Sequence, residues 1–193
     1  MDSDKATLPF GSETMLARVV RQMGEVVATT VVVAEPGQSL GELPAGVKVA
    51  YDRHPGRGPL EGLAAGLSAI QEEADVVYAS GCDAPFLVPA FVEQMFDLLG
   101  EHGGGEYEIA VPTDGEYHHP LAAAYRVSVL PHIQRLLAAG RLRTAVLFDE
   151  VNTRKVPIEQ LRGVDPELAT LENINRPEDY RAALRRAGLG ETS

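Results

Sequence analysis

The sequence predicts an α/β fold, a Rossmann-like three-layer α/β/α sandwich with a mostly parallel sheet. Short β-branched runs alternate along the chain with helical patterns, which is the order of elements in βαβ units. One such run, TTVVVA at 29–34, has the composition of a strand buried on both faces of a parallel sheet. Because 193 residues suffice for one compact core, we expect a single domain over residues 1–193.

The first predicted element is a helix over residues 12–23. Its apolar residues recur at helical spacing, so that one face carries Met15, Val19 and Met23. Ser12 is a candidate N-cap, and Gly24 stands where a helix stop is expected. The strand at 29–34 follows.

The later elements alternate in the same way. Residues 53–62, RHPGRGPLEG, are so rich in glycine and proline that we expect a loop without regular structure. Further strands are expected at 47–51, 75–80, 108–112 and 121–125, and helices at 63–70, 89–99, 128–139 and 177–187.

The composition predicts an acidic protein of the reducing cytosol. The formal net charge is −11, from 17 Lys and Arg against 28 Asp and Glu, which argues against nonspecific binding to DNA or RNA. No apolar run approaches the roughly 18 residues that cross a bilayer. Cys82 is the only cysteine, so the chain cannot form an internal disulfide. We expect a cytoplasmic protein that binds neither nucleic acid nor membrane.

An aspartate follows one of the predicted strands where ligands bind in open α/β sheets. Asp83 lies in GCDAP, residues 81–85, directly after DVVYAS. At the carboxyl end of a strand, its carboxylate could hold Mg²⁺, an ion that prefers oxygen ligands and bridges to substrate phosphates. The alternative is that Asp83 caps the helix near Pro89 or stabilises a turn. Taken alone, the motif favours the cap or turn.

The glycine-rich segment at 55–62, PGRGPLEG, leads into a helix. Glycines let a backbone approach a ligand closely, and the N–H groups at a helix N-terminus favour anions. The alternative is a mobile surface loop, which is the commoner role of such segments. The segment follows Asp52 at a strand end, as a phosphate- or base-binding loop would.

Three further polar positions are candidates for ligand contacts. Lys5 could neutralise a triphosphate, although a surface lysine is ordinary. His118 and His119 are adjacent, so in a strand they point to opposite faces, and one histidine contacting an anion or pterin is expected rather than a metal pair. Asn175, two residues before Pro177, is the expected N-cap of the last helix.

Five segments, in order along the chain, resemble the molybdenum cofactor guanylyltransferase family of the nucleotidyltransferase-A superfamily. They are DKATLPF (4–10), RGPLEGLAAGL (57–67), GCDAPFL (81–87), HPLAAAYR (119–126) and NINRPEDY (173–180). Their order and spacing are more specific than any single segment. The resemblance implies transfer of GMP from GTP to molybdopterin with release of pyrophosphate and with Mg²⁺ as cofactor.

The resemblance also implies roles for individual residues. Lys5 would neutralise the triphosphate and Asp83 would bind Mg²⁺, so that both are catalytic and both contact the nucleotide. The remaining nucleotide contacts would be Asp52, Gly58, Pro59, Leu60 and Gly62, and the acceptor side would be lined by His119, Asn173 and Asn175. The implied partners are GTP and molybdopterin, with transient contact to molybdenum cofactor enzymes or their chaperones.

The chain departs from the family pattern in three places. Ala34 and Glu35 stand where the family often has Asn, and Arg176 stands where it usually has Thr. The family's first strand and its LAGGxSxRM phosphate loop have no counterpart here. We therefore expect a native chain with about 15–20 more residues, and unpaired edges on the two strands that would flank the absent one.

Two alternatives and one electrostatic expectation follow from the same residues. The chain could be a related cytidylyltransferase, or a catalytically silent homologue that acts as a binding or regulatory protein. Because the overall charge is negative, an anionic substrate requires a local basic pocket. We expect this pocket to be built from some of Lys5, Arg53, His54, Arg57, His119 and Arg126.

Overall fold

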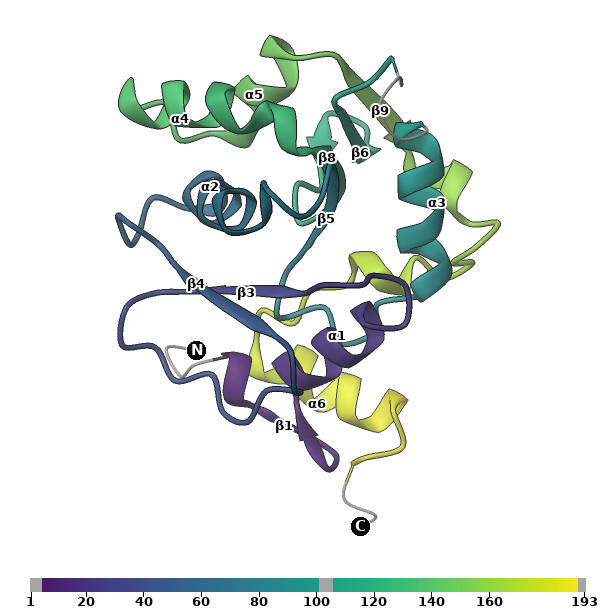
Figure 1. Ribbon diagram of the computed structural model, residues 1–193. Helices are drawn as coiled ribbons and strands as arrows, with labels where there is room; N and C mark the ends of the chain where they lie inside the picture. Colours follow the sequence, from purple (N-terminus) through teal and green to yellow (C-terminus); the bar gives the residue numbers. More distant parts are fainter. Residues whose placement is uncertain (1–4, 101–105, 191–193) are drawn as a thin grey trace.

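The computed structural model describes residues 5–100 and 106–190 and has a mixed α/β fold (Figure 1). Its larger sheet contains, in spatial order, β5 (Val76–Ser80), β8 (Ala122–Arg126), β6 (Ile109–Asp114) and β7 (Tyr117–His118), and β9 (Thr153–Pro157) pairs with β6. A second sheet consists of β3 (Val31–Ala34) and β4 (Lys48–Tyr51), and a short hairpin consists of β1 (Pro9–Phe10) and β2 (Glu13–Thr14).

The sheets are mixed rather than mostly parallel. Among the described strands, β3–β4 and β6–β9 are parallel, whereas β1–β2, β5–β8, β6–β7 and β6–β8 are antiparallel. The reason lies in the connection from β6 to β8. It runs through the turn at Gly115 and the short strand β7, and a parallel neighbour would need a crossover of a dozen or more residues.

Several strands have an edge that no other described strand covers, and β3 and β5 are two of them. β3 pairs only with β4, and β5 pairs only with β8. The carbonyls of Thr30 and Ala34 accept from β4, so the intervening Val31 and Val33 direct their backbone groups to the other side. Among the described strands, β3 and β5 thus each have an uncovered edge, while an absent strand between them and a longer native chain stay predictions.

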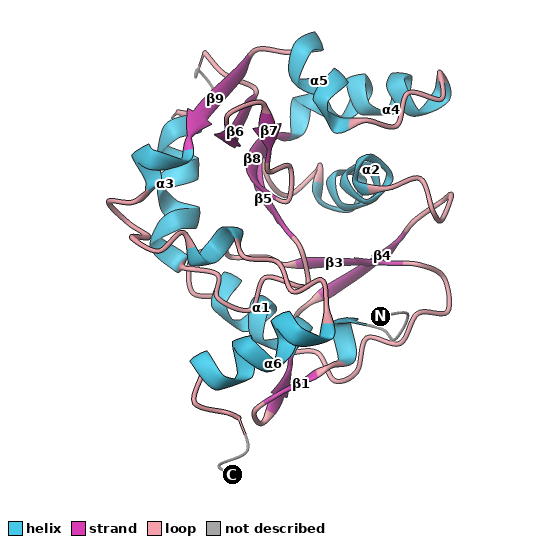
Figure 2. Ribbon diagram, turned by 180° about the vertical axis from the view of Figure 1, so that it is seen from behind, coloured by secondary structure: helices cyan, strands magenta, loops and turns pink. Residues whose placement is uncertain are grey.

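Helices cover both faces of the larger sheet, because successive side chains of a strand point to opposite faces. Ile109 and Tyr125 pack with α2 (Pro59–Ile70), α4 (Leu130–Ala138) and α5 (Thr144–Glu150). Ala110 and Ala124 pack with α3 (Pro89–Leu99) on the other face. Figure 2 shows β5 and β8 between α2 and α3. The complete three-layer sandwich over one domain stays a prediction.

The N-terminal helix is shorter than its sequence pattern suggests. α1 (Met15–Met23) begins at Met15 because the preceding residues form the β1–β2 hairpin. Thr14, not Ser12, is the N-cap, and its Oγ1 accepts a hydrogen bond from Ala17 N at 3.1 Å. The predicted stop at Gly24 is confirmed.

The second helix is longer than predicted, because the end of the glycine-rich segment is helical. α2 begins at Pro59, whose fixed φ suits the first helical position. Gly58 precedes it with a φ of +76°, which a side chain would strain.

The other boundaries fall close to expectation, although the short strands β1, β2 and β7 were not predicted. α3 matches its predicted range, and α6 (Pro177–Arg186) ends one residue early. α5 and β9 were not predicted; β9 reads TRKVP, and only Val156 of it is buried, so it carries no apolar pattern. The 3₁₀ helices are η1 (Lys5–Thr7), η2 (Val127–Val129), η3 (Ile158–Leu161) and η4 (Ala169–Leu171). None of the helices in the described ranges has the length and apolar character needed to cross a bilayer.

Candidate functional site

Some of the candidate residues gather where β5 ends and β8 begins. Ser80, the last residue of β5, is paired with Ala122, the first of β8, so the segments 81–85 and 119–121 lie at the same end of the sheet. Cys82 packs against the cluster that contains Val32 of β3. The end of β5 therefore lies beside the separate β3–β4 sheet, from which Asp52 follows β4.

Asp83 contacts residues that are far away in the sequence. Its Oδ2 accepts a hydrogen bond from Lys5 Nζ at 3.1 Å, and its backbone carbonyl accepts from Ile174 N at 2.8 Å. Lys5 Nζ also donates to Asn175 Oδ1 at 2.8 Å. Lys5, Asp83 and Asn175 thus meet at one point, which we call the Asp83 corner.

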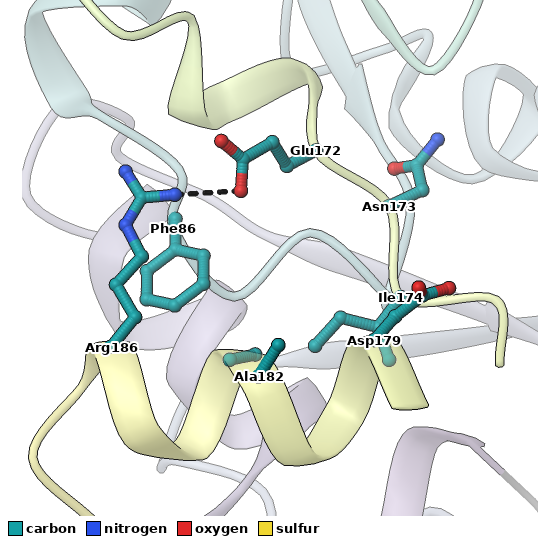
Figure 3. A pocket seen from close by; sticks show the side chains of 8 residues that line it. Phe86, Glu172, Asn173, Ile174, Asp179, Ala182 and Arg186 are labelled. Atoms are coloured by element: carbon teal, nitrogen blue, oxygen red, sulfur yellow. Dashed lines mark hydrogen bonds and ion pairs between the residues drawn. The ribbon is translucent and has the colours of Figure 1, made fainter. Parts of the chain in front are cut away.

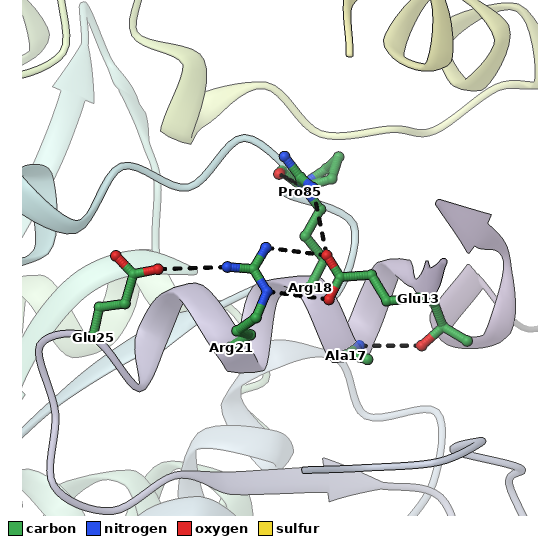
Figure 4. A network of polar contacts seen from close by, with 7 residues as sticks. Glu13, Ala17, Arg18, Arg21, Glu25 and Pro85 are labelled. Carbon is green, nitrogen blue, oxygen red and sulfur yellow. Dashed lines mark hydrogen bonds and ion pairs between the residues drawn. The ribbon is translucent and has the colours of Figure 1, made fainter. Parts of the chain in front are cut away.

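The backbone of this corner is fixed by α1. Arg18 Nε donates to the Pro85 carbonyl at 2.8 Å, and the guanidinium forms an ion pair with Glu13 at 3.5 Å (Figure 4). The same guanidinium lies over the Phe10 ring at 5.0 Å. Arg18 was not predicted as a site residue. A basic residue beside the apolar face of a helix does not indicate that its side chain donates to a carbonyl far away in the sequence.

Gly81 makes room for the Asp83 carboxylate. A Cβ added at Gly81 would lie 2.5 Å from Asp83 Oδ1, a distance at which one of the two must shift. The glycine is therefore required by the position of the carboxylate. Of the alternative roles for Asp83, the cap of α3 is excluded because the N-cap of that helix is Val88, whereas Asp83 does lie in a turn.

The Asp83 corner fits a divalent ion that is shared with phosphates. The Asp83 side chain is 20% exposed, and only one of its oxygens contacts Lys5. No cluster of three or more His, Cys, Asp or Glu side chains occurs among the residues of the described ranges. A metal here would receive one protein carboxylate and would take its other ligands from substrate phosphates and water, the usual arrangement for Mg²⁺.

The segment from Asp52 to Gly62 is the second part of the site. Asp52 is held at the end of β4 by a hydrogen bond from its N–H to the Ala34 carbonyl at 3.0 Å. Burial raises the pKa of the Asp52 carboxyl, and the negative charges of Glu61 and Glu35 raise it further. Asp52 Oδ1 lies 3.9 Å from a Cβ placed at Gly62, so these two predicted residues are neighbours.

The contribution of Leu60 is limited to its backbone. Its side chain is fully buried among the core residues of α2 and α4. Gly58 and Pro59 are the N-cap and first residue of α2, so the first backbone N–H groups of that helix lie at this point.

The two adjacent histidines face different neighbours, as expected. The His119 ring lies edge-on to Tyr117 at 4.8 Å, and the His118 ring lies 5.2 Å from the Phe148 ring. Burial lowers the pKa of both imidazoles. Neither Nε2 atom has a hydrogen-bond partner within the described residues. His119 is near the sheet end of the Asp83 corner, but no recorded interaction joins it to Lys5 or Asp83.

Asn175 is not the N-cap of α6, contrary to prediction. Arg176 occupies the cap, and the Asp179 carboxylate accepts from the N–H groups of Asn175 and Arg176 at 3.3 and 2.9 Å. The Asn175 side chain is therefore available for Lys5. The N-cap is Arg176 rather than Asn175 because Asp179, at the third position of the helix, accepts hydrogen bonds from the backbone that precedes the helix.

Asn173 lines a hollow of about 350 Å³ between the 172–174 segment and α6 (Figure 3). Arg186 closes one side of this hollow: it forms a hydrogen bond with Glu172 at 2.6 Å and lies over the Phe86 ring at 4.6 Å. Asn173 and Asn175 thus belong to one chain segment, but only Asn175 has a recorded contact with the Asp83 corner.

The predicted basic pocket does not include Arg126. Its guanidinium donates to the carbonyls of Tyr107 and Gly100 at 2.9 and 3.3 Å. Arg126 pairs with Val76 at the start of β5, because β8 runs antiparallel to it. It therefore lies at the opposite end of the sheet from Asp83.

Comparison with known sequences decides the family. A sequence model of the MobA-like NTP transferase domain matches residues 1–153. The chain belongs to this family. A probable molybdenum cofactor guanylyltransferase of Mycobacterium avium (strain 104) is 34% identical over 186 residues, which cover 94% of this chain and 87% of that protein.

Solved structures share the fold of this MobA-like chain. Molybdopterin-guanine dinucleotide biosynthesis protein A of Archaeoglobus fulgidus superposes with a TM-score of 0.77 at 23% identity, covering 95% of this chain and 90% of that one. A Mycobacterium tuberculosis H37Rv protein solved in complex with manganese superposes with a TM-score of 0.65 at 16% identity, covering 94% and 91%.

Proposed function

We propose that this chain is a Mg²⁺-dependent nucleotidyltransferase that transfers GMP from GTP to molybdopterin and releases pyrophosphate. The observation that carries the proposal is the Asp83 corner, where Lys5, Asp83 and Asn175 meet at the end of β5. The family and the guanylyltransferase relative support the same reaction. The manganese complex of the Mycobacterium tuberculosis fold neighbour is consistent with a divalent metal.

The proposed reaction is an in-line displacement at phosphorus. A phosphate oxygen of molybdopterin attacks the α-phosphorus of GTP, the bond from that phosphorus to the bridging oxygen breaks, and pyrophosphate leaves with the electron pair. Positioning and charge neutralisation supply the catalysis, so no protein nucleophile is needed. A bound Mg²⁺ would neutralise charge on the phosphates.

Each part of the site has a proposed role in this reaction. Lys5 is the mobile cation for the triphosphate, since its ammonium already lies 3.1 Å from Asp83 Oδ2 and could turn to a phosphate. Asp83 would hold the metal. The nucleotide is bordered by Asp52, Gly58, Pro59, the Leu60 backbone and Gly62, and the acceptor is bordered by His119, Asn173 and Asn175.

The cellular setting is part of the proposal as well. A chain with a single cysteine and a net charge of −11 suits the reducing cytoplasm. Delivery of a finished cofactor would bring transient contact with molybdenum cofactor enzymes or their chaperones.

Pyrophosphate release tests the proposed function. The protein is incubated with Mg²⁺, molybdopterin and each nucleoside triphosphate in turn. We expect release with GTP and little with the others. Release with CTP alone would instead assign a cytidylyltransferase. No release with any nucleotide, from protein that is folded by circular dichroism, would favour the catalytically silent homologue.

A further inference from the structure

Glu61 is a buried carboxylate in the first turn of α2, and none of the roles above uses it. Its side chain is 5% exposed. Oε1 lies 3.2 Å from His54 Nδ1, and Oε2 lies 3.8 Å from Arg57 Nη1. Among the described residues, no group donates a hydrogen bond to Oε2. Since a buried carboxylate is costly unless it is paired, Arg57 is the cation that compensates its charge, and His54 adds a hydrogen-bonding contact.

Arg57 extends this contact to a second helix. Its Nη2 donates to the Leu137 carbonyl at 3.0 Å. Leu137 lies in the last turn of α4, where the helix dipole favours a cation, and its carbonyl also accepts from Gly140 N at 3.1 Å. Arg57 therefore connects the loop at 53–58 to α4 through Leu137 and to α2 through Glu61.

The loop depends on these side-chain contacts because its glycines make few others. Gly56 and Gly58 have φ angles of +81° and +76°, and no atom outside their chain neighbours lies within 4 Å of a Cβ added at either. The backbone here is not packed against other elements on those sides. Within the described residues, the loop is therefore connected to the helices by the side chains of His54 and Arg57, besides the backbone hydrogen bond from Glu61 N to the Gly58 carbonyl at 3.2 Å.

We propose that Glu61 is a positioning residue of the nucleotide site. Through Arg57 and His54, its carboxylate fixes the 53–58 loop beside Asp52 in the conformation that receives a nucleoside triphosphate. This inference rests on the proposed nucleotidyl transfer and extends it to a residue that does not touch the substrate.

Stability and binding should respond to Glu61 in different ways. Replacing a buried, incompletely paired carboxylate by the neutral Gln removes a desolvation cost, so the midpoint of thermal unfolding should stay unchanged or rise. The loop should nevertheless loosen, because Arg57 loses its charged partner. A residue that served the fold alone would lose stability and binding together.

The experiment compares Glu61→Gln, Arg57→Gln and the double variant with the wild type. Glu159→Gln is the matched control, since it removes a 69% exposed carboxylate of η3 that pairs with Arg162 at the end of that helix. Three quantities are measured: amide hydrogen exchange of residues 53–58 without nucleotide, the thermal midpoint, and kcat and KM for GTP in the pyrophosphate assay.

Both single variants should exchange faster at 53–58 and show a KM for GTP that is raised roughly tenfold or more, the scale of one charge-assisted contact. At saturating GTP, kcat should stay within about twofold of the wild type, because the chemical step is untouched. The double variant should add little to either single change. The control should match the wild type.

Several results would overturn the inference. Wild-type exchange rates or a wild-type KM in Glu61→Gln would do so, as would additive effects in the double variant. A thermal midpoint that falls in Glu61→Gln together with the loss of binding would assign the residue to the fold alone. If the wild type released no pyrophosphate from any nucleotide, the proposed function would fail, and the exchange rates would still decide whether Glu61 fixes the loop.

Discussion

The two acidic parts of the site differ in how their charges are compensated. At the Asp83 corner, the carboxylate has a lysine partner at 3.1 Å, and the surrounding chain is held by Ile174 and Arg18. In the 52–62 segment, Asp52 and Glu61 each bury an oxygen that has no hydrogen-bond partner among the described residues.

This difference suggests a division of labour. A cation and an anion already in contact can exchange partners with a metal and a phosphate, so the Asp83 corner suits the step in which charge moves. The 52–62 segment contains two like charges close enough that Glu61 raises the pKa of Asp52. We infer that this segment serves nucleotide recognition, because several neighbouring side chains, rather than one ion pair, set its geometry.

Removing the charge at Asp83 should have the largest effect. In an active protein, Asp83→Asn should lower turnover by at least roughly 100-fold, the scale of losing one electrostatic stabiliser of the transition state. Asp149→Asn, which changes a 75% exposed carboxylate on α5, is the control. Near-normal pyrophosphate release by Asp83→Asn would remove the distinction between the two regions.

Moving the Asp83 carboxylate without changing its charge should have a smaller effect. Gly81→Ala places a Cβ 2.5 Å from Asp83 Oδ1, so the carboxylate must shift. We expect turnover to fall roughly tenfold, because small misplacements of catalytic groups are costly. Gly163→Ala is the matched control, since nothing lies within 4 Å of its added Cβ. Equal turnover in the two variants would show that the carboxylate position does not matter.

Asp52 should show its effect mainly in the pH dependence of stability. Its pKa is raised in the folded protein, so its contribution to stability is present at low pH and is lost as pH rises through the folded pKa. Asp52→Asn should therefore be more stable than the wild type at pH 7, and the difference should shrink as the pH falls toward about 3.9, the ordinary value for Asp.

Urea unfolding at a series of pH values measures this change. A difference in the free energy of unfolding that grows as the pH falls would reverse the predicted sign. In that case the folded protein would stabilise the ionised Asp52 carboxylate.

Local signals predicted most helices and strands of this fold. The apolar spacing of α1, the stop at Gly24 and the bounds of α3 can be read from neighbouring residues. The pairing of the strands could not be predicted in this way. Whether β8 runs parallel or antiparallel depends on partner strands far along the chain. β9 could not be predicted from its own residues, because it forms a strand through its pairing with β6.

The residues of the candidate site also fall into those that local sequence predicts and those that it does not. Asp83 and the glycine-rich segment were found because their motifs are local. Arg18 and Glu61 were missed, since their roles arise from contacts with Pro85 and with the His54–Arg57 pair that only folding creates. Arg126 was placed wrongly because the direction of β8 decides which end of the sheet it occupies.

The most direct test of this division of labour is to measure kcat and KM for GTP in Asp83→Asn and Glu61→Gln side by side. We predict that Asp83→Asn lowers kcat by roughly 100-fold with a smaller change in KM. Glu61→Gln should raise KM roughly tenfold and leave kcat near the wild-type value. The same pattern of change in both variants, or the reverse assignment of the two effects, would contradict the division.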